Sequence, residues 1–363
     1  MIRFLALTPG EDAPEVDAAI RRVIERGWFI LGPEVEAFER EFASATASEH
    51  GVGVGTGTDA LGIALRALDI GPGSEVITSP LSATYSALAI LSAGARPVFA
   101  DIDPSRLTLD PQAVVAAVTS RTAAIMPVHI YGQSADMPAL MRVASRYNLA
   151  VIEDCCQAHL ATCEGRPVGS FGHAAAYSFY PTKNLGALGD AGAITTNDPQ
   201  LARRARRIRN GGQTDRYRHD EYGVNSRLDE IQAAILRARL PFLRRWTERR
   251  RALARDYRKA LAGAPVEVPV EHDSGHAYHL FPVLSVQRDA VRRQLDSAGV
   301  ETLIHYPIPI PKQKAIGSTD GCPIADRICS EVFSLPLYPA LDPSAIARVS
   351  DALRAYAVTA PDR

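Results

Sequence analysis

Short apolar runs alternate with longer amphipathic stretches through the first two thirds of the chain. The runs EVITSP, ARPVFADI, TAAIMPVHIYG, LAVIEDCCQA and AAAYSFY are typical of buried strands. Between them, TDALGIALRALDI, TYSALAILSAG and DMPALMRVASRYN have apolar residues at helical spacing. Because alternating strands and helices require crossover connections, we expect an α/β fold whose central sheet is mostly parallel and lies between helices.

The pattern changes after about residue 240. A long helix is predicted over LRRWTERRRALARDYRKALAG, and the proline-broken segment APVEVPVEHDSGHAYHLFPVLSV and mixed elements follow it. We therefore expect a large α/β domain over residues 1–240 and a smaller C-terminal α+β domain over residues 241–363.

Composition and charge narrow the possible functions. The chain has 40 Lys and Arg against 41 Asp and Glu, so no overall field favours nucleic acid or an anionic membrane. Five cysteines show no spacing that suggests a disulfide framework or a metal clip, which favours a reducing compartment. Without a recognisable signal segment or membrane-spanning run, we expect a cytoplasmic protein.

Ligands of parallel sheets gather at the carboxyl ends of strands, so the residues after each apolar run are the first candidates. In GVGVGTGTDALGIAL, Gly55, Gly57 and Thr58 precede a helix expected to start near Asp59. Their backbone N–H groups and the Thr58 hydroxyl would suit a phosphate at the positive helix end. An ordinary helix start capped by Thr58 or Asp59 is the alternative.

The strand in VIEDCCQAHLA ends in Glu153 and Asp154. A carboxylate buried at a strand end is costly unless it meets a cation, a metal or a protonated ring nitrogen. The alternatives are that Asp154 caps the next helix or holds Mg²⁺ together with Glu153. No further acidic cluster completes an oxygen-rich metal site, so we expect no metal.

Two further residues complete a chemical pattern. Tyr85 opens a helix in SPLSATYSALAI, where its ring would form a wall for a planar ligand or pack in the core. Lys183 lies in SFYPTKNLGALGDAG as an exposed loop lysine or an enclosed amine able to form a Schiff base. A lysine, a carboxylate, an aromatic face and a phosphate cup are together what pyridoxal 5′-phosphate (PLP) requires.

The segments GTGTDAL, ATYSA, EDCCQAHLA, SFYPTKNLGALGDAGA and GVNSRLDEIQAAIL follow one another in the order of a known family. With them the chain resembles the nucleotide-sugar aminotransferases of the DegT/DnrJ/EryC/StrS type, within the PLP-dependent fold type I enzymes named for aspartate aminotransferase. The resemblance covers nearly the whole length. It implies a large PLP-binding domain and a smaller C-terminal domain.

The resemblance also implies roles around PLP. Lys183 would form the Schiff base, Asp154 would pair with the pyridine nitrogen and Gln157 would contact the ring hydroxyl. The remaining cofactor contacts would be Tyr85 stacked on the ring, Gly57, Thr58 and Ser178 at the phosphate, and Asn225 reaching that phosphate from a neighbouring subunit. The protein would therefore be a homodimer with shared active sites.

The chain departs from the family pattern at a few positions. Cys155 and Cys156 stand where the family usually has alanine or another small residue, and two small thiols fit a tight space. Leu160 and Ala191 stand where the family commonly has glycine, so the resemblance does not predict the backbone conformation at these two positions.

The resemblance further implies a ping-pong transfer of an amino group from L-glutamate to a nucleotide-linked keto sugar, with PLP cycling through pyridoxamine 5′-phosphate. FYPTKNLGALGDAG looks most like enzymes that act at C-3 of dTDP-linked 3-keto-6-deoxyhexoses. Tyr180, His305 and Tyr306 are the candidates for the sugar pocket, and packing aromatics and a hydrogen-bonded histidine are the alternatives.

Other functions compete with this hypothesis. A C-4 nucleotide-sugar aminotransferase or a keto-cyclitol aminotransferase would share the cofactor residues. Dehydratases of the same family have a histidine in place of the lysine, so Lys183 argues against that reaction. A non-catalytic regulatory relative would have no reason to keep both Lys183 and Asp154.

Overall fold

A seven-stranded sheet forms the centre of the molecule in the computed structural model, which describes residues 1–318 and 321–359. The strand order is β1-β9-β8-β5-β4-β2-β3. The strands β2, β3, β4, β5 and β8 pair with one another in parallel, and β9 runs antiparallel to both of its neighbours. The α/β fold with a mostly parallel sheet is therefore confirmed.

The element bounds are as follows. The strands are β1 (His50–Val54), β2 (Glu75–Thr78), β3 (Arg96–Phe99), β4 (Thr122–Met126), β5 (Ala150–Asp154), β6 (Thr162–Cys163), β7 (Arg166–Pro167), β8 (Ala174–Ser178), β9 (Gly192–Thr196), β10 (Gln213–Asp215), β11 (Arg218–His219), β12 (Phe281–Leu284) and β13 (Val332–Leu335). The helices are α1 (Ala13–Arg26), α2 (Pro33–Ala45), α3 (Gly57–Ala67), α4 (Tyr85–Ser92), α5 (Pro111–Ala117), η1 (Ile130–Gly132), α6 (Met137–Tyr147), α7 (Pro199–Arg209), α8 (Glu230–Ala260), α9 (Arg288–Ser297), η2 (Ile310–Lys312), α10 (Pro323–Glu331) and α11 (Ser344–Thr359).

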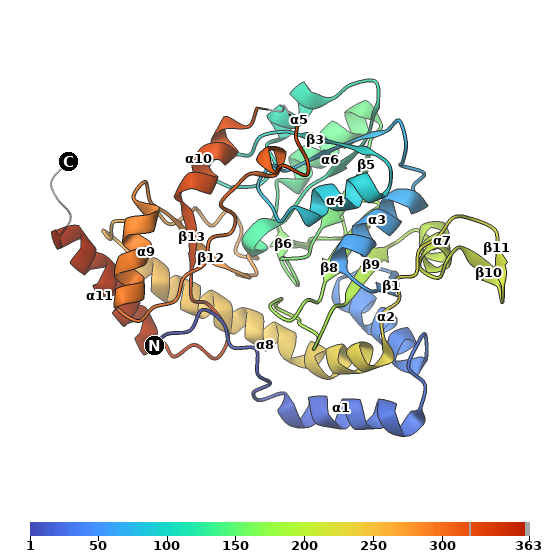
Figure 1. Cartoon of the computed structure of the whole chain (residues 1–363), viewed down its shortest axis with the longest axis horizontal. Coiled ribbons are helices and arrows are strands. Elements are labelled where there is room, and N and C mark those ends of the chain that lie inside the picture. Colours follow the sequence, from blue (N-terminus) through green and yellow to red (C-terminus); the bar gives the residue numbers. More distant parts are fainter. Residues whose placement is uncertain (319–320, 360–363) are drawn as a thin grey trace.

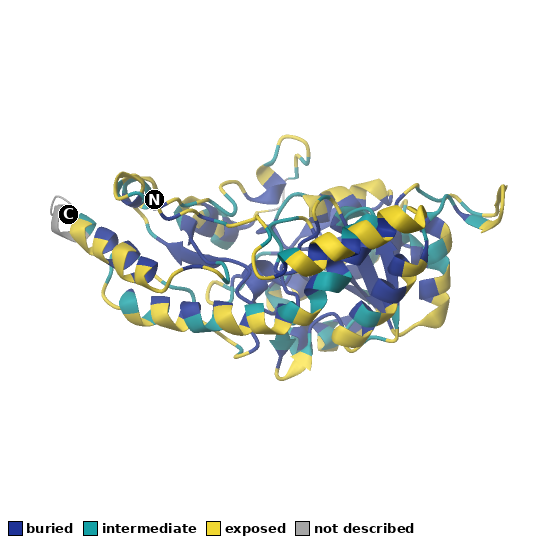
Figure 2. Cartoon of the chain, turned by 90° about the horizontal axis from the view of Figure 1, so that it is seen from below, coloured by how far each residue is buried: buried dark blue, intermediate teal, exposed yellow. Residues whose placement is uncertain are grey.

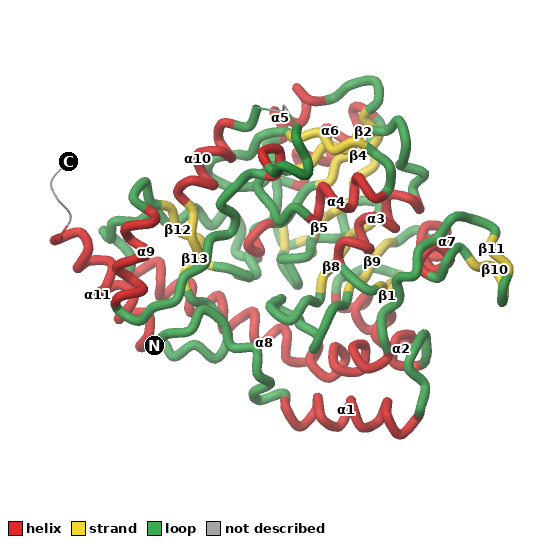
Figure 3. Tube along the Cα trace, viewed as in Figure 1, coloured by secondary structure: helices red, strands yellow, loops and turns green. Residues whose placement is uncertain are grey.

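Helices cover both faces of the sheet, which explains why its strands are apolar throughout. Helices α2, α5, α6 and the first half of α8 share one buried cluster with the sheet. Helices α3, α4 and α7 share a second cluster with the opposite face. Figures 1 and 3 show these two layers, and Figure 2 shows buried strands between helices that expose only their outer sides.

A second, smaller core lies towards the C-terminus. It combines the last turns of α8 with β12, β13, α9 and α11, and Ile2 from the opposite end of the chain packs into it. Ile2 also forms a parallel bridge with Val300. The division into residues 1–240 and 241–363 remains a prediction, since α8 runs continuously across residue 240.

Helix α8 is longer than the stretch predicted for it, because it begins at Glu230 and continues through Pro241. Pro241 is exposed, so the carbonyl that loses its helical partner lies on the solvent side. None of the helices in the described part of the chain combines the length and the apolar composition needed to cross a membrane.

The first turn of α8 caps helix α2 through the side chain of Glu230. The N-cap residue of α2 is Gly32, which has no side chain to accept a hydrogen bond. The fully buried Glu230 carboxylate accepts N–H bonds from Gly32 at 2.9 Å, Glu34 at 3.0 Å and Val35 at 2.8 Å. This carboxylate therefore satisfies the free amides of α2 and fixes α2 against α8.

We expect Glu230→Ala to lower the free energy of unfolding by about 3 kcal/mol, because three buried N–H groups lose a charged acceptor. Urea unfolding followed by circular dichroism measures the change. The matched control is Asp256→Ala, an exposed acidic residue of the same helix, which should shift the value by no more than about 0.5 kcal/mol. Equal losses in both variants would contradict the capping role.

Candidate active site

The candidate residues come together because the carboxyl ends of β1, β2, β5 and β8 share one edge of the sheet. The turn after β1 supplies Gly57 and Thr58, and the segment after β2 supplies Tyr85. Asp154 is the last residue of β5, and Ser178 is the last residue of β8 with Lys183 in the following loop. Parallel register thus converts dispersed sequence positions into one site.

The start of α3 forms a cup against the end of β8. The helix begins at Gly57, capped by Thr56 Oγ1, which accepts the Asp59 N–H at 3.0 Å. The expected start near Asp59 and the cap by Thr58 or Asp59 were therefore wrong. A Cβ on Gly57 would lie 2.7 Å from Ser178 Cβ and 2.9 Å from Cys156 Sγ, so only glycine fits this approach.

The Asp154 carboxylate is 5% exposed and forms no ion pair within the described chain. Its Oδ2 accepts a hydrogen bond from Ser86 Oγ at 2.9 Å, and its Oδ1 accepts the Cys156 N–H at 3.1 Å. A carboxylate held in this way is oriented but not neutralised, so it suits a cationic ligand atom. Sequence reasoning missed Ser86, whose only signal was a small hydroxyl in the helix turn that Tyr85 opens.

Glu153 faces the other side of β5 and has a structural role. Its carboxylate accepts N–H bonds from Gly169 at 2.7 Å, Phe171 at 2.8 Å and Gly172 at 2.8 Å. The His129 ring lies 3.1 Å away through Nε2. The other ring nitrogen of His129, Nδ1, accepts the Ala135 N–H, so Nε2 carries the proton and donates to Glu153. These bonds occupy the carboxylate and tie the loop after β7 to the sheet.

Lys183 is half-buried, and its backbone N–H donates to Tyr180 O at 2.8 Å. Burial lowers the pKa of the Lys183 amine below its usual value, while the nearby Asp154 carboxylate acts in the opposite direction. A lowered pKa leaves more of the amine neutral and nucleophilic. Burial, followed by the nearby Asp154, raises the pKa of Cys156 well above that of a free thiol, so Cys156 is a neutral thiol.

Gln157 is held at both ends of its amide. Its Oε1 accepts the Tyr131 N–H at 2.7 Å, and its Nε2 donates to the Tyr306 hydroxyl at 3.0 Å. Burial raises the pKa of Tyr306 to about 12 against the opposing effect of the Gln157 bond. Tyr306 is therefore a neutral phenol, and its hydroxyl is held by the Gln157 amide.

The two other predicted pocket residues differ in their surroundings. The Tyr180 side chain is largely exposed. His305 stacks on Phe4 and its Nδ1 lies 3.0 Å from Ser334 Oγ. Burial, and secondarily the Lys183 charge, lowers the pKa of His305 to about 4, so the ring is neutral. His305 is both a packed ring and a neighbour of Lys183, and its sugar-binding role remains a prediction.

Asn225 is exposed, and the next residue joins this segment to the turn before α3. Ser226 Oγ accepts the Gly55 N–H at 2.9 Å and donates to Asp59 Oδ2 at 2.7 Å. The predicted role of Asn225 needs a second subunit, so it stays a prediction.

The model of the DegT/DnrJ/EryC1/StrS aminotransferase family matches residues 11–354. The chain belongs to this family. It is 47% identical to the dTDP-3-amino-3,4,6-trideoxy-alpha-D-glucose transaminase of Streptomyces venezuelae over 94% of this chain and 92% of the relative. The structure of S. venezuelae DesV in complex with a ketimine intermediate covers 99% of both chains with a TM-score of 0.96 and 45% identity.

A further member of the fold was solved with a bound cofactor. The structure of NtdA from Bacillus subtilis with bound PMP has a TM-score of 0.92 and 31% identity, covering 98% of this chain and 84% of that one. This chain has the features that such a cofactor requires. They are a cup that a single Cβ would fill, a buried carboxylate without an ion pair among the described residues, and an enclosed lysine. The donor set therefore fits PLP.

We expect Gly57→Ala to weaken PLP binding by about 10- to 100-fold, because the added methyl group would displace Ser178 and Cys156 from the cup. Titration of the apoprotein with PLP, followed by visible absorbance, gives the dissociation constant. Gly321→Ala is the matched control, since its Cβ would meet nothing within 4 Å. Unchanged PLP affinity in Gly57→Ala would place the phosphate elsewhere.

Proposed function

We propose that this aminotransferase transfers an amino group from L-glutamate to C-3 of a dTDP-linked 3-keto-6-deoxyhexose, with PLP as cofactor. The observation that carries the proposal is the 47% identity with a dTDP-3-amino sugar transaminase over 94% of the chain. The buried, uncompensated Asp154 and the enclosed Lys183 support retention of the catalytic chemistry. A non-catalytic relative would gain nothing from burying such a carboxylate.

Lys183 and Asp154 carry the proton chemistry. When bound, PLP supplies an aldehyde that condenses with amines and a protonated ring that takes up electrons. Lys183 Nζ is the attachment point, and after displacement it removes the α-proton of the donor and later delivers a proton to the sugar carbon. Asp154 keeps the ring nitrogen protonated, and Ser86 and the Cys156 N–H hold its two oxygens in place.

The remaining cofactor residues bind and orient the group. The N–H groups at the start of α3, together with Thr58 and Ser178, hold the phosphate at the positive helix end. The exposed Tyr85 ring stacks on the pyridine. Gln157 uses its second N–H for the ring hydroxyl, because Tyr306 takes only one.

The sugar pocket is assigned to Tyr180, His305 and Tyr306. The neutral imidazole and the neutral phenol can hydrogen-bond to sugar hydroxyls without adding charge beside Lys183. The five cysteines show no spacing typical of a disulfide framework, which suits a reducing compartment, and we place the enzyme in the cytoplasm.

We further propose a homodimer with shared active sites. Tyr85 at the site is 63% exposed in the single chain and Tyr180 is 51% exposed, while Trp28 and Phe29 are also exposed. A second subunit would cover such apolar side chains and bring its Asn225 to the phosphate.

Mixing subunits tests this shared site. Lys183→Ala and Asn225→Ala are each expected to be nearly inactive. Reassociation of equal amounts after mild dissociation should restore about a quarter of the wild-type activity, because half of the dimers then contain one intact site. No recovery, with mixed dimers confirmed by native mass spectrometry, would mean that Asn225 acts within its own chain.

The substrate is tested with a panel of acceptors and glutamate. We expect turnover of dTDP-3-keto-6-deoxyhexoses, with dTDP-4-keto sugars and keto-inositols at least about 100-fold slower in kcat/KM. Borohydride should fix the cofactor to Lys183, and Lys183→Ala should lose at least about 1,000-fold in kcat. Lys259→Ala, an exposed lysine, is the control. Faster turnover of a 4-keto sugar or a cyclitol would overturn the proposed substrate.

A further inference from the structure

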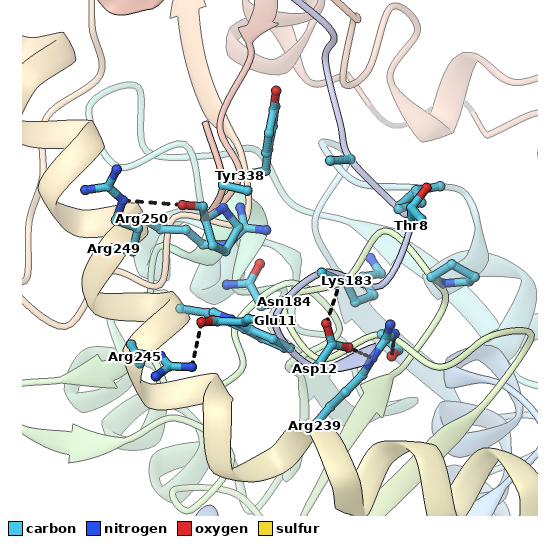
Figure 4. Close-up of a pocket in the computed structure, with 18 residues that line it drawn as sticks. Thr8, Glu11, Asp12, Lys183, Asn184, Arg239, Arg245, Arg249, Arg250 and Tyr338 are labelled. Carbon is cyan, nitrogen blue, oxygen red and sulfur yellow. Dashed lines mark hydrogen bonds and ion pairs between the residues drawn. The ribbon is translucent and has the colours of Figure 1, made fainter. Parts of the chain in front are cut away.

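A cavity of about 470 Å³ adjoins Lys183 on the side of helix α8. This size is within the range that holds small-molecule ligands. Its walls come from the N-terminal segment, the Lys183 loop, α8 and the segment after β13. In Figure 4, Arg249 and Arg250 lie across the cavity from Lys183, and Asn184 lies between these two arginines and Lys183.

Arginines dominate the charged residues of this cavity, and some of them are already paired. Arg239 forms an ion pair with Asp12 at 2.7 Å, and Arg245 forms one with Glu11 at 2.8 Å. Within the described chain Arg250 has no such carboxylate, and neither does Arg249 at the exposed end. The cavity therefore keeps an excess of positive charge beside Lys183.

Arg250 differs from the other buried arginines of the described residues. Arg209 and Arg239, each 7% exposed, are paired with Glu39 and Asp12 respectively. Arg250 is only 5% exposed and has no acidic partner. Burial alone lowers the pKa of its guanidinium to about 10. A buried charge without a counter-ion is costly, so the site is suited to an anion from outside the chain.

The hydrogen bonds of Arg250 leave one edge of the guanidinium free. Its Nη1 donates to three backbone carbonyls, those of Tyr278 at 3.2 Å, His279 at 3.3 Å and Leu337 at 2.9 Å. Its buried Nε has no hydrogen-bond partner. The carbonyls therefore orient the group, and the edge that carries Nε can donate hydrogen bonds to the two oxygens of one carboxylate.

Arg250 and Lys183 also act on the same neighbour. Burial lowers the pKa of His279 well below its usual value, and the charges of Lys183 and then Arg250 lower it further. His279 Nδ1 lies 3.3 Å from Asn184 Oδ1, next to Lys183 in the chain. Because Arg250 and Lys183 line the same cavity, an anion on Arg250 would share that cavity with the amine where the donor reacts.

We propose that Arg250 binds a carboxylate of the amino donor in this cavity. The inference rests on the proposed transamination and extends it to the recognition of the donor. An amino acid carries its α-carboxylate on the same carbon as the reacting amine, so an anion site beside Lys183 matches it. The diphosphate of a nucleotide sugar is the other available anion, and the experiments below distinguish it from the donor carboxylate.

Separate half-reactions test the proposal on the cofactor-loaded enzyme. In Arg250→Lys the apparent second-order rate constant with glutamate should fall by about 10- to 100-fold. The half-reaction of the aminated enzyme with the keto sugar should change by less than about threefold. Arg255→Lys, an exposed arginine of α8, is the matched control. Equal losses in both half-reactions, or a loss only with the sugar, would overturn the proposal.

Binding without turnover provides a second measurement. Calorimetry with glutarate, a dicarboxylate without an amine, should show weakened binding in Arg250→Lys, whereas dTDP should bind as in the wild type. Lost dTDP binding with intact glutarate binding would assign Arg250 to the diphosphate and overturn the proposal. Unchanged binding of both, or loss of both, would overturn it too.

A crystal of the wild-type enzyme covers the case in which Arg250→Lys does not fold. Soaked with glutarate, it should show a carboxylate within hydrogen-bond distance of the Arg250 guanidinium, and glutarate bound elsewhere would refute the assignment.

If the wild type fails to aminate any keto sugar but binds glutarate at Arg250, the proposed function fails and the donor site stands. If it aminates the sugar and Arg250 has no effect, only this inference fails.

Discussion

The site depends on one buried carboxylate that forms no ion pair with any residue in the described part of the chain. Asp154 ends β5 in the interior, and Ser86 and the Cys156 N–H fix its oxygens without neutralising them. Burial of this group is costly, and we propose that a protonated ring nitrogen of the cofactor offsets that cost. Lys183 lies near enough for its pKa to respond to Asp154. In the proposed reaction, the two residues therefore serve the electron-accepting ring and the proton transfers from one enclosed site.

The remaining contacts are arranged by close packing at the edge of the sheet. Gly57 lets α3 approach Ser178 and Cys156 so closely that a methyl group would not fit. Away from the site, Glu230 caps α2 and fixes it against α8, the helix that also carries Arg250. Helix α8 thus links the packing of the large sheet to the wall of the cavity beside Lys183.

The buried charged side chains of the described chain are of two kinds, those with partners of opposite charge or full hydrogen bonding and those without. Glu153 is fully bonded and Arg209 and Arg239 have carboxylate partners, so these groups serve the fold. Among the described residues, Asp154 and Arg250 have no counter-ion. Asp154 acts on the Lys183 amine and Arg250 lines the cavity beside it, so charges of both signs lie near Lys183. This arrangement suits the proposed binding of a cationic ring and an anionic donor.

The sequence by itself determined the alternation of strands and helices, and therefore the parallel sheet and the edge at which Asp154, Ser178 and Lys183 meet. Local pattern is sufficient for this because each buried strand and amphipathic helix has its own period. Only the tertiary structure decided the cap at Thr56, the bond from Ser86 to Asp154, the continuation of α8 through Pro241 and the lack of a carboxylate at Arg250. These features depend on which distant groups approach one another, and spacing along the chain does not specify that distance.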